Sequence, residues 1–366
     1  MSLLRRVDTK VGVTLIVLLT QLVAACESNG SQAATPSVTL EVPQPVPHSL
    51  VVPHAEKSAQ PIPIRRPLPQ LAVLWRRDGS ENDTILMVPR IHAVSDRSVI
   101  IVDAARQAIV LLDLKNGSVQ REFGRRGHGP GELADAARMA VVSQSRIAIF
   151  DRENGAIKSY STDGALLSEH AAGISSISSA CALSGTAVLI ALLGKDDIAH
   201  YAADGTMSVA FHRVWPDQEE TEALLRSPIL VQNRASGSCL AIQPYGGRIA
   251  ELSANGVIRR AILYRDDRPL KIQRRGDRNK GTENRVIRGQ PTIEDACVSD
   301  GHLLLLRATS DSSKVLDVFG IHAFEFLGSL PINRQTITIG CSTNVIVAKE
   351  YSDGLLHFVA YAKVTR

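Results

Sequence analysis

The sequence predicts an all-β protein whose folded part is a six-bladed β-propeller that follows a signal peptide and a disordered proline-rich linker. Three observations predict this: an apolar run that ends at a cysteine, a proline-dense stretch, and a strand–turn–strand unit that recurs through the rest of the chain. The predicted domains are residues 1–25 (signal peptide), 26–69 (a tether that begins at Cys26) and 70–366 (propeller).

The overall charge and the aromatic content argue against a nucleic-acid partner. Arg5, Arg6 and Lys10 against Asp8 give residues 1–25 a net charge of +2, so the mature chain keeps only about half of the total of +4. Nucleic-acid binding needs a concentrated basic face. Aromatic residues make up 4% of the chain, which also weakens any site based on base stacking.

The amino-terminal segment has the order of features of an export signal. A basic start precedes a mostly apolar run at 11–23, which is too short for a permanent membrane helix but suits a signal peptide. Residues 22–26 (Leu-Val-Ala-Ala-Cys) resemble the lipobox of bacterial lipoproteins. That resemblance implies cleavage before Cys26, acylation of Cys26, and a membrane as partner through the lipid anchor. The alternative is an ordinary cleaved signal with a chance cysteine.

The residues after the cysteine predict the destination and a stalk. Glu27 stands where an aspartate would resemble an inner-membrane retention signal, so we expect an outer-membrane protein that faces the periplasm. Nine of the 17 prolines fall between Pro36 and Pro69. This spacing excludes helices and central strands and favours an extended tether.

A repeated unit of two strands and a tight turn fills the chain from residue 88 onward. Asn-Gly and Asp-Gly turns tolerate the positive φ angles of two-residue hairpins, and here they are 47, 41 and 51 residues apart. Such a period suits a propeller blade. The four clear copies pair the strands 109–112, 157–160, 198–201 and 249–252 with turns at 116–117, 163–164, 204–205 and 255–256.

Further strands complete six units and close the ring. Each copy is preceded by a β-rich strand, at 99–102, 147–150, 188–193 and 239–242, and two more units lie at 303–318 and 345–359. The last unit has only three strands, while residues 71–75 form an unassigned strand before the first unit. We therefore expect residues 71–75 to pair with the final blade as its outer edge.

The first two units also resemble the NHL-type propeller family. The matching residues are Val102-Asp103, Ile109, Leu112, Phe123-Gly124, Gly127, Gly129-Pro130-Gly131-Glu132-Leu133, Asp151 and Ile157. The stretch at 129–132 looks like the connection between blades in that family and in six-bladed propeller lipoproteins of bacteria. The resemblance covers about residues 95–165 and implies a fold and a general binding role.

Three long connections between blades are expected to share one face of the disc, at 121–137, 213–227 and 258–291. In the first, Arg125, Arg126 and His128 form a candidate site for an anion or carboxylate. The competing interpretation is that the glycines shape a tight crossing and Glu132 binds backbone donors.

The third connection is rich in basic residues, among them Arg274 and Arg275, and these two are the candidate ligand-binding residues there. The second connection is acidic over 217–226. Charges of opposite sign on adjacent connections favour mutual pairing or solvation over a polyanion site.

The cysteines and histidines predict structural roles. Cys181, Cys297 and Cys341 occupy equivalent positions near the end of the innermost strands, where small residues fit around the tunnel, and Cys239 lies one strand further out. Export permits disulfides, and four cysteines allow three pairings. No spacing resembles a zinc site, and no metal ligand set is predicted.

The leading functional hypothesis is a non-catalytic, membrane-tethered binding module, because no catalytic motif was found in the sequence. A protein or an anionic ligand on the loop face would be its partner. The alternative is a metal-dependent hydrolase or lyase that resembles the lactonase-like propellers, with its site at the tunnel mouth. Asp96, Asp103, Asp151 and Asp300 keep that option open, although most of them lie at turns or strand ends. No cofactor is identified.

Overall fold

The computed structural model of the chain describes residues 71–362, with short undescribed stretches. The signal peptide, Cys26 and the proline-rich tether therefore lie outside the described residues. Among the described residues, no helix has the length and hydropathy that a membrane span requires. The undescribed stretches within that range are 79–90, 94–96, 104–105, 144, 172–176, 184–186, 193–196, 203–206, 214–226, 246, 254–255, 257, 265–270, 276–283, 289–292 and 310.

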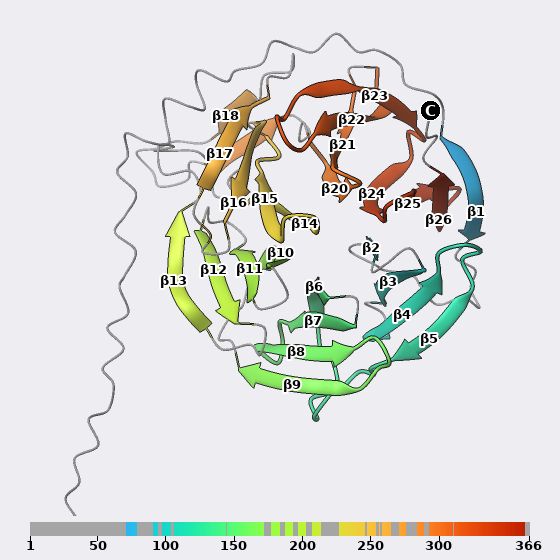
Figure 1. Ribbon diagram of the computed structural model, residues 1–366, viewed down its shortest axis with the longest axis vertical. Helices are drawn as coiled ribbons and strands as arrows, with labels where there is room; N and C mark the ends of the chain where they lie inside the picture. The colour runs from blue at the N-terminus through green and yellow to red at the C-terminus, as the bar shows by residue number, and fades with distance from the viewer. Residues whose placement is uncertain are drawn as a thin grey trace, which may run out of the picture. The chain divides into compact units, whose positions relative to one another are not determined.

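Six four-stranded antiparallel sheets stand around a common axis, so the predicted six-bladed β-propeller is confirmed (Figure 1). Within each blade the strands follow one another from the axis outward. Blade 1 contains β2 (Ile91–Ala93), β3 (Ser98–Asp103), β4 (Ala108–Asp113) and β5 (Val119–Phe123). Blade 2 contains β6 (Ala136–Ser143), β7 (Arg146–Asp151), β8 (Ala156–Ser161) and β9 (Leu166–Ala171). Blade 3 contains β10 (Ile177–Leu183), β11 (Ala187–Leu192), β12 (Asp197–Ala202) and β13 (Met207–Arg213).

The second half of the ring adds one element that belongs to no blade, the β18–β19 hairpin, which forms a two-stranded sheet of its own. Blade 4 contains β14 (Ile229–Asn233), β15 (Ser238–Ile242), β16 (Arg248–Leu252) and β17 (Ile258–Leu263). Blade 5 contains β20 (Asp295–Ser299), β21 (His302–Ala308), β22 (Lys314–Gly320) and β23 (Phe326–Ile332). Blade 6 contains β24 (Thr336–Cys341), β25 (Val345–Ser352) and β26 (Leu355–Ala362), and its outer strand is β1 (Ala72–Asp78). The hairpin strands are β18 (Lys271–Arg275) and β19 (Asn284–Arg288).

The ring closes through its first strand, as predicted. Strand β1 pairs antiparallel with β26, from Ala72 opposite Ala362 to Asp78 opposite His357. The final blade therefore has the order β1-β26-β25-β24 and combines the two ends of the described chain. This pairing covers an edge of β26 that would otherwise expose its backbone donors and acceptors.

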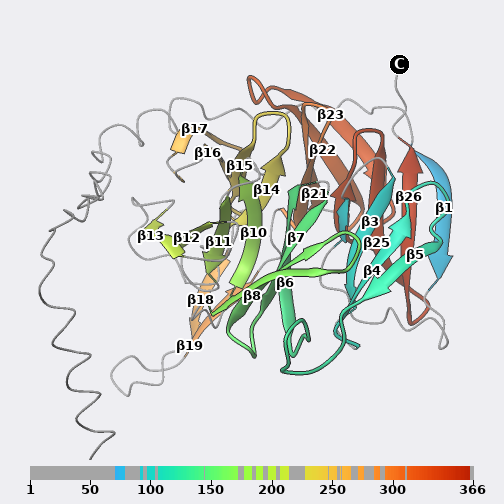
Figure 2. The ribbon, with the colours of Figure 1, turned by 60° about the horizontal axis from the view of Figure 1, so that its bottom comes forward.

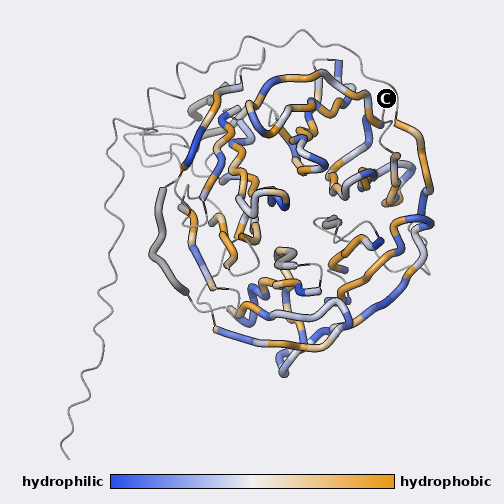
Figure 3. The backbone as a smooth tube through the Cα atoms, viewed as in Figure 1, coloured by the Kyte–Doolittle hydropathy of each residue, from blue (hydrophilic) through white to orange (hydrophobic). Residues whose placement is uncertain are grey.

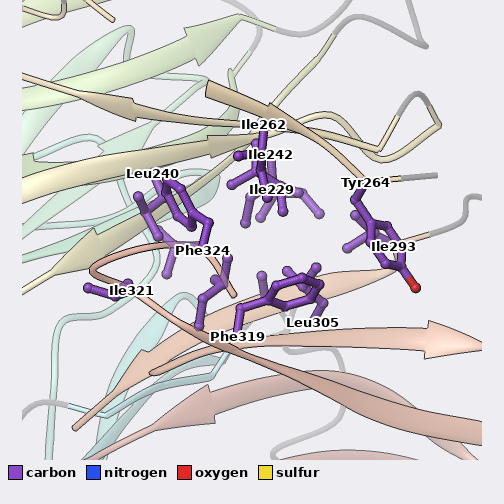
Figure 4. Packing of buried hydrophobic residues seen from close by; sticks show 14 residues of the cluster. Ile229, Leu240, Ile242, Ile262, Tyr264, Ile293, Leu305, Phe319, Ile321 and Phe324 are labelled. Atoms are coloured by element: carbon purple, nitrogen blue, oxygen red, sulfur yellow. The ribbon is translucent and has the colours of Figure 1, made fainter. Parts of the chain in front are cut away.

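The hydrophobic core lies between neighbouring blades. The middle strands are hydrophobic on both faces because each blade is packed between two others, and Figure 3 shows this pattern beside the more hydrophilic outer strand β5. Six clusters of buried side chains lie at the six junctions of the ring in the described part. Figure 4 shows the cluster between blades 4 and 5, where Tyr264 and Phe319 make an edge-to-face contact.

Arginines on outer strands tie each blade to the next one at three junctions. Arg77 donates to the carbonyl of Gly117 at 2.9 Å, and Arg121 donates to the carbonyl of Asp163 at 2.8 Å. At a third junction Arg260 donates to the carbonyls of Ile321 and His322. In each case the acceptor lies in the turn between the third and fourth strands of the following blade.

Aromatic rings on two of the same outer strands pack against glycines in these turns. Trp75 lies over Gly117, and its indole nitrogen donates to the carbonyl of Leu114 at 2.7 Å. Phe123 lies over Gly164 in the same way. The glycine of the repeated turn thus has two roles: it adopts the positive φ of its own hairpin, and it leaves room for an aromatic ring of the neighbouring blade.

Both disulfides join neighbouring blades. The structure thus has one of the three cysteine pairings that the sequence left open. Cys181 of β10 bonds to Cys239 of β15, and Cys297 of β20 bonds to Cys341 of β24. The bridges close loops of 58 and 44 residues. The cysteines lie on the strands that the sequence predicted, but their physical role is to link blades rather than only to fit a crowded tunnel.

The bounds of two predicted connections need correction. The segment 121–123 belongs to β5, so the first connection covers only 124–135. The segment 258–263 is the outer strand β17, and the connection after it contains the β18–β19 hairpin. Adjacent charged residues, Arg121-Glu122 and Arg259-Arg260, made both segments resemble loops, because an outer strand exposes one face and one edge to solvent.

We expect the two bridges to survive as the sole pairing in the purified protein and to stabilise the ring by about 2–4 kcal/mol each. Peptide mapping without reduction should recover Cys181 linked to Cys239 and Cys297 linked to Cys341. A reducing agent should lower the melting temperature of the wild type and leave that of the fourfold Cys→Ala variant unchanged. Recovery of any other pairing would contradict the structure.

Gly164→Ala should destabilise the protein more than Gly155→Ala. Both glycines have positive φ, of 91° and 58°, so both substitutions strain the backbone by about 1 kcal/mol. A Cβ at Gly164 would lie 2.9 Å from the ring of Phe123, whereas a Cβ at Gly155 would meet nothing within 4 Å. The clash should cost about 1–3 kcal/mol more in urea unfolding; equal losses would show that the ring contact does not matter.

Candidate functional site

The candidate site is the loop face. This is the side of the disc that carries the connections from the outermost strand of one blade to the innermost strand of the following blade. Because the four strands of a blade alternate in direction, all of these connections emerge on one side, together with the turns between second and third strands. The long ones are 79–90, 124–135, 214–228 and 264–294, and within them residues 79–90, 214–226, 265–270, 276–283 and 289–292 lie outside the described residues. Figure 2 shows the first connection and the β18–β19 hairpin on the same side of the disc.

The structure does not bring the two predicted groups of binding residues together. Arg125, Arg126 and His128 lie between blades 1 and 2, whereas Arg274 and Arg275 lie on β18 between blades 4 and 5. These two junctions are three blades apart, on opposite sides of the axis (Figure 1). One small ligand therefore cannot contact both groups.

The glycine-rich connection folds around the carboxylate of Glu132. The amide of Gly129 donates to Oε2 of Glu132 at 2.9 Å. A Cβ at Gly127 would lie 2.0 Å from the same oxygen, so only glycine fits there. The backbone closes the loop through bonds from Gly127 to the carbonyl of Leu133 at 3.1 Å and from Leu133 to the carbonyl of Arg125 at 2.8 Å. The glycines and Glu132 thus have the structural role that the sequence offered as the competing interpretation.

The three candidate side chains of this connection are exposed, and Arg125 and His128 have identified side-chain partners. Arg125 makes an ion pair with Glu132 at 2.7 Å, and the side chain of Arg125 is 80% exposed. His128 Nδ1 lies 2.7 Å from Oδ1 of Asn154 in the neighbouring turn. Arg126 is exposed beside them, and its backbone bridges to Leu133. The ligand-binding role of these three residues remains a prediction.

A buried lysine supports the connection from below. Lys158 of β8 is fully buried, and its Nζ donates to the carbonyl of Glu132. The same Nζ lies 3.2 Å from Glu169 and 3.4 Å from Asp151. Tyr160, two residues along β8, donates to the carbonyl of Gly131 at 2.9 Å. Burial raises the pKa of Tyr160, so its hydroxyl keeps the proton that it donates.

Asp151 fastens the end of the connection to blade 2. Its carboxylate accepts from the amides of Ala134 at 3.0 Å and Asp135 at 2.9 Å, and from the side chain of Asn154 at 2.7 Å. Burial opposes ionisation of this carboxyl, but these donors outweigh burial and lower its pKa. A carboxylate with this many donors is a structural anchor, which is the role that the sequence favoured for Asp151.

Three arginines around the first connection pair with carboxylates. Arg106 donates to Asp103 at 2.5 Å, and Arg152 donates to Asp135 at 2.6 Å. Together with the Arg125–Glu132 pair, these contacts balance charge at the junction between blades 1 and 2. In the described part of the chain, no three His, Cys, Asp or Glu side chains are grouped so that they could hold a metal ion. The metal-dependent alternative gains no support from the described residues.

Sequence reasoning missed Lys158 and Tyr160, the two β8 residues that hold the loop. The signal was present, because Lys158 stands inside a strand whose neighbours are predicted to be buried. A buried lysine must find partners, and the nearby glycine-rich loop offered carbonyls and carboxylates. Periodicity alone does not reveal which of these groups it reaches.

The β18–β19 hairpin is described by its backbone register. Lys271 lies opposite Arg288, and Arg274 lies opposite Arg285. The apolar pair Ile272 and Ile287 lies between these two pairs. The hairpin therefore places basic residues directly opposite each other on adjacent strands.

Comparisons with known proteins agree with the fold. A family model described as "6-bladed beta-propeller" matches residues 81–197, about a third of the chain. A search of curated proteins gave no significant match. A solved protein of Bacteroides fragilis that is described as exported is similar to this chain with 15% identity and a TM-score of 0.52, over 80% of this chain and 95% of that one.

Two other solved structures are similar to this chain at low identity. The WD40 repeats of RRP9 are 11% identical, with a TM-score of 0.51 over 80% of this chain and 100% of that one, and this similarity shows the fold alone. A virginiamycin B lyase of Staphylococcus aureus is 11% identical over 79% of this chain and 99% of that one, with a TM-score of 0.44.

Lys158→Met should destabilise the protein by about 3 kcal/mol, because it leaves the buried carboxylate of Asp151 and that of Glu169 without their cation. The exposed Lys115→Met variant is the matched control and should stay within about 0.5 kcal/mol of the wild type. Urea unfolding measures both. Similar stability of the two variants would show that Lys158 does not support the connection.

The Glu132 carboxylate should make the protein sensitive to acid. Its pKa is lowered, first by the amide of Gly129 and also by Arg125, so the ionised form is favoured in the folded state. Its contribution to stability is present above the ordinary pKa of a glutamate and is lost as the pH falls through the lowered pKa. The free energy of unfolding of Glu132→Gln should therefore fall less on acidification than that of the wild type and of the exposed control Glu153→Gln. Parallel pH curves for wild type and Glu132→Gln would contradict this role.

Proposed function

We propose that this propeller is an exported, lipid-anchored binding module that recognises a partner through its loop face and performs no catalysis. The observation that carries the exported location is the pair of bridges between blades, Cys181–Cys239 and Cys297–Cys341. Disulfides of this structural kind form and persist in oxidising compartments outside the cytoplasm. The leader and the lipobox-like residues 22–26 support the same location.

The proposed anchor is Cys26, in the outer membrane, with the propeller in the periplasm. Residues 22–26 support acylation, and Glu27 supports sorting to the outer membrane. The similarity to a Bacteroides fragilis protein described as exported agrees with this location. The NHL-like residues of the first two units support a general binding role rather than a defined chemistry.

The topology supports an accessible loop face. The start of β1 pairs with the end of β26 at Ala362, while the end of β1 reaches His357, beside the turn that joins β25 and β26. That turn lies on the loop face, so the chain enters β1 from the opposite side of the disc. A tether that arrives on the opposite side leaves the loop face open to a partner.

The binding role is supported by the construction of the face. The connection of residues 124–135 is held in one conformation by Glu132, Asp151 and Lys158, so it presents Arg125, Arg126 and His128 on a fixed support. A prearranged surface binds with a smaller loss of conformational entropy. Arg274 and Arg275 would contribute a separate contact across the axis.

The anchor is tested by metabolic labelling with palmitate. The wild type should incorporate the label and fractionate with membranes, whereas Cys26→Ala should incorporate none. Globomycin-type inhibition should cause the unprocessed wild-type chain to accumulate. Equal labelling of wild type and Cys26→Ala would contradict lipid anchoring at this residue.

The binding face is tested by photo-crosslinking in cells. A photoreactive amino acid at position 126, on the loop face, should give a defined adduct. The same group at position 115, in the turn between β4 and β5 on the opposite side, is the matched control and should give little. Equal adducts from both positions, or none from several loop-face positions, would contradict binding through this face.

A further inference from the structure

The β18–β19 hairpin is an addition to the propeller rather than part of it. Blade 4 is complete at β17 and blade 5 begins with β20, and between them β18 and β19 pair only with each other in the described sheet topology. Figure 2 shows the hairpin on the loop-face side of the disc. An element that the ring does not need for closure is available for another role.

The hairpin segment is strongly basic. The two described strands, β18 and β19, contain five Lys and Arg residues and no Asp or Glu. The register sets Lys271 opposite Arg288 and Arg274 opposite Arg285, and like charges directly opposite each other destabilise a strand pair. The two strands therefore carry no acidic residue of their own to balance these charges.

The alternation of strand residues sorts the hairpin positions into two faces. One face carries Lys271, Arg275 and Arg288 together with Gln273, Asn284 and Val286, whereas the other carries the pairs Ile272–Ile287 and Arg274–Arg285. The first of these faces groups three basic residues, which suits electrostatic contact with lipid phosphates.

The absence of aromatic residues narrows the class of ligand. Residues 265–291 contain no Phe, Tyr or Trp. Recognition of single-stranded nucleic acid uses aromatic stacking, so a segment without it offers little beyond charge. Charge alone is sufficient for phospholipid headgroups, because each Lys or Arg near an anionic bilayer contributes without base or sugar specificity.

We propose that the β18–β19 hairpin binds the anionic phospholipid headgroups of a membrane. The inference rests on the proposed export and tethering, which bring the propeller to a bilayer. The 44 residues between Cys26 and Leu71 span roughly 130 Å when extended, which lets the loop face reach the bilayer although the chain enters on the other side of the disc. The hairpin would add a second, salt-sensitive membrane contact to the acyl anchor.

Vesicle binding tests the proposal with a chain that starts at Glu27, which lacks the anchor and keeps every described residue. The chain should bind vesicles of phosphatidylglycerol and phosphatidylcholine, bind poorly to phosphatidylcholine alone, and release as salt is raised. The triple variant Lys271→Gln, Arg275→Gln, Arg288→Gln should bind on the order of 100-fold more weakly, from about 1 kcal/mol per basic residue.

The matched control removes three exposed positive charges elsewhere, at Lys115, Arg259 and Arg334, each changed to Gln. It changes the net charge equally and should keep near-wild-type binding; thermal melting confirms that both triple variants are folded. Equal losses in the two variants would reduce the effect to net charge and overturn the proposal. No wild-type binding to anionic vesicles would also overturn it.

Two further arms separate the other sources of an effect. A second variant changes four acidic residues of the neighbouring connection to Asn or Gln: Asp217, Glu219, Glu220 and Glu222. If these acids neutralise the hairpin, the wild type should fail to bind vesicles and this variant should bind them. That result would overturn the proposal for the native chain. Binding to inorganic polyphosphate without binding to vesicles would replace the membrane by a soluble polyanion. Because the tested chain is unacylated, none of these results depends on Cys26.

Discussion

The pairing of β1 with β26 is the constraint on which the rest of the structure depends. Without it the last blade would have three strands, and the junction between blades 6 and 1 would lose Trp75, which is buried and donates to the carbonyl of Leu114 in blade 1. Losing a buried tryptophan typically costs about 3–5 kcal/mol. The packing at the other junctions also depends on a closed ring, because each blade packs against two neighbouring blades. Closure also decides which side of the disc the preceding chain reaches.

The fold was largely predictable because its signals are local and repeated. Asn-Gly and Asp-Gly turns demand positive φ, as at Gly117 and Gly164, and they recur at the interval of a blade. The edge strand could be assigned by elimination, since only residues 71–75 were left to complete the last sheet. The end of β5 and the whole of β17 were predicted as loop, because charged residues interrupt both strands: Arg121 and Glu122 in β5, Arg259 and Arg260 in β17. Polar outer strands need their partners in space to be identified.

The contacts of the candidate site were less predictable because they link residues that are distant in the sequence. The sequence offered two interpretations of the Arg125–Glu132 loop, and the structure shows how Glu132 and the glycines hold the loop together. The support from Lys158 depends on the position of a neighbouring strand, which spacing does not give. The cysteine pairing was undetermined for the same reason, since adjacency of blades decides it. The membrane proposal rests on the surplus of basic residues in the sequence of β18 and β19.

Hydrogen exchange measured by mass spectrometry tests ring closure most directly. If β1 completes the last blade, peptides that cover Ala72–Asp78 should exchange slowly, like the outer strand β5, and should open together with peptides of β26 as denaturant is raised. Rapid, complete exchange in Ala72–Asp78 while Leu355–Ala362 stays protected would show that the two strands are not paired, and the account of a closed ring would fail.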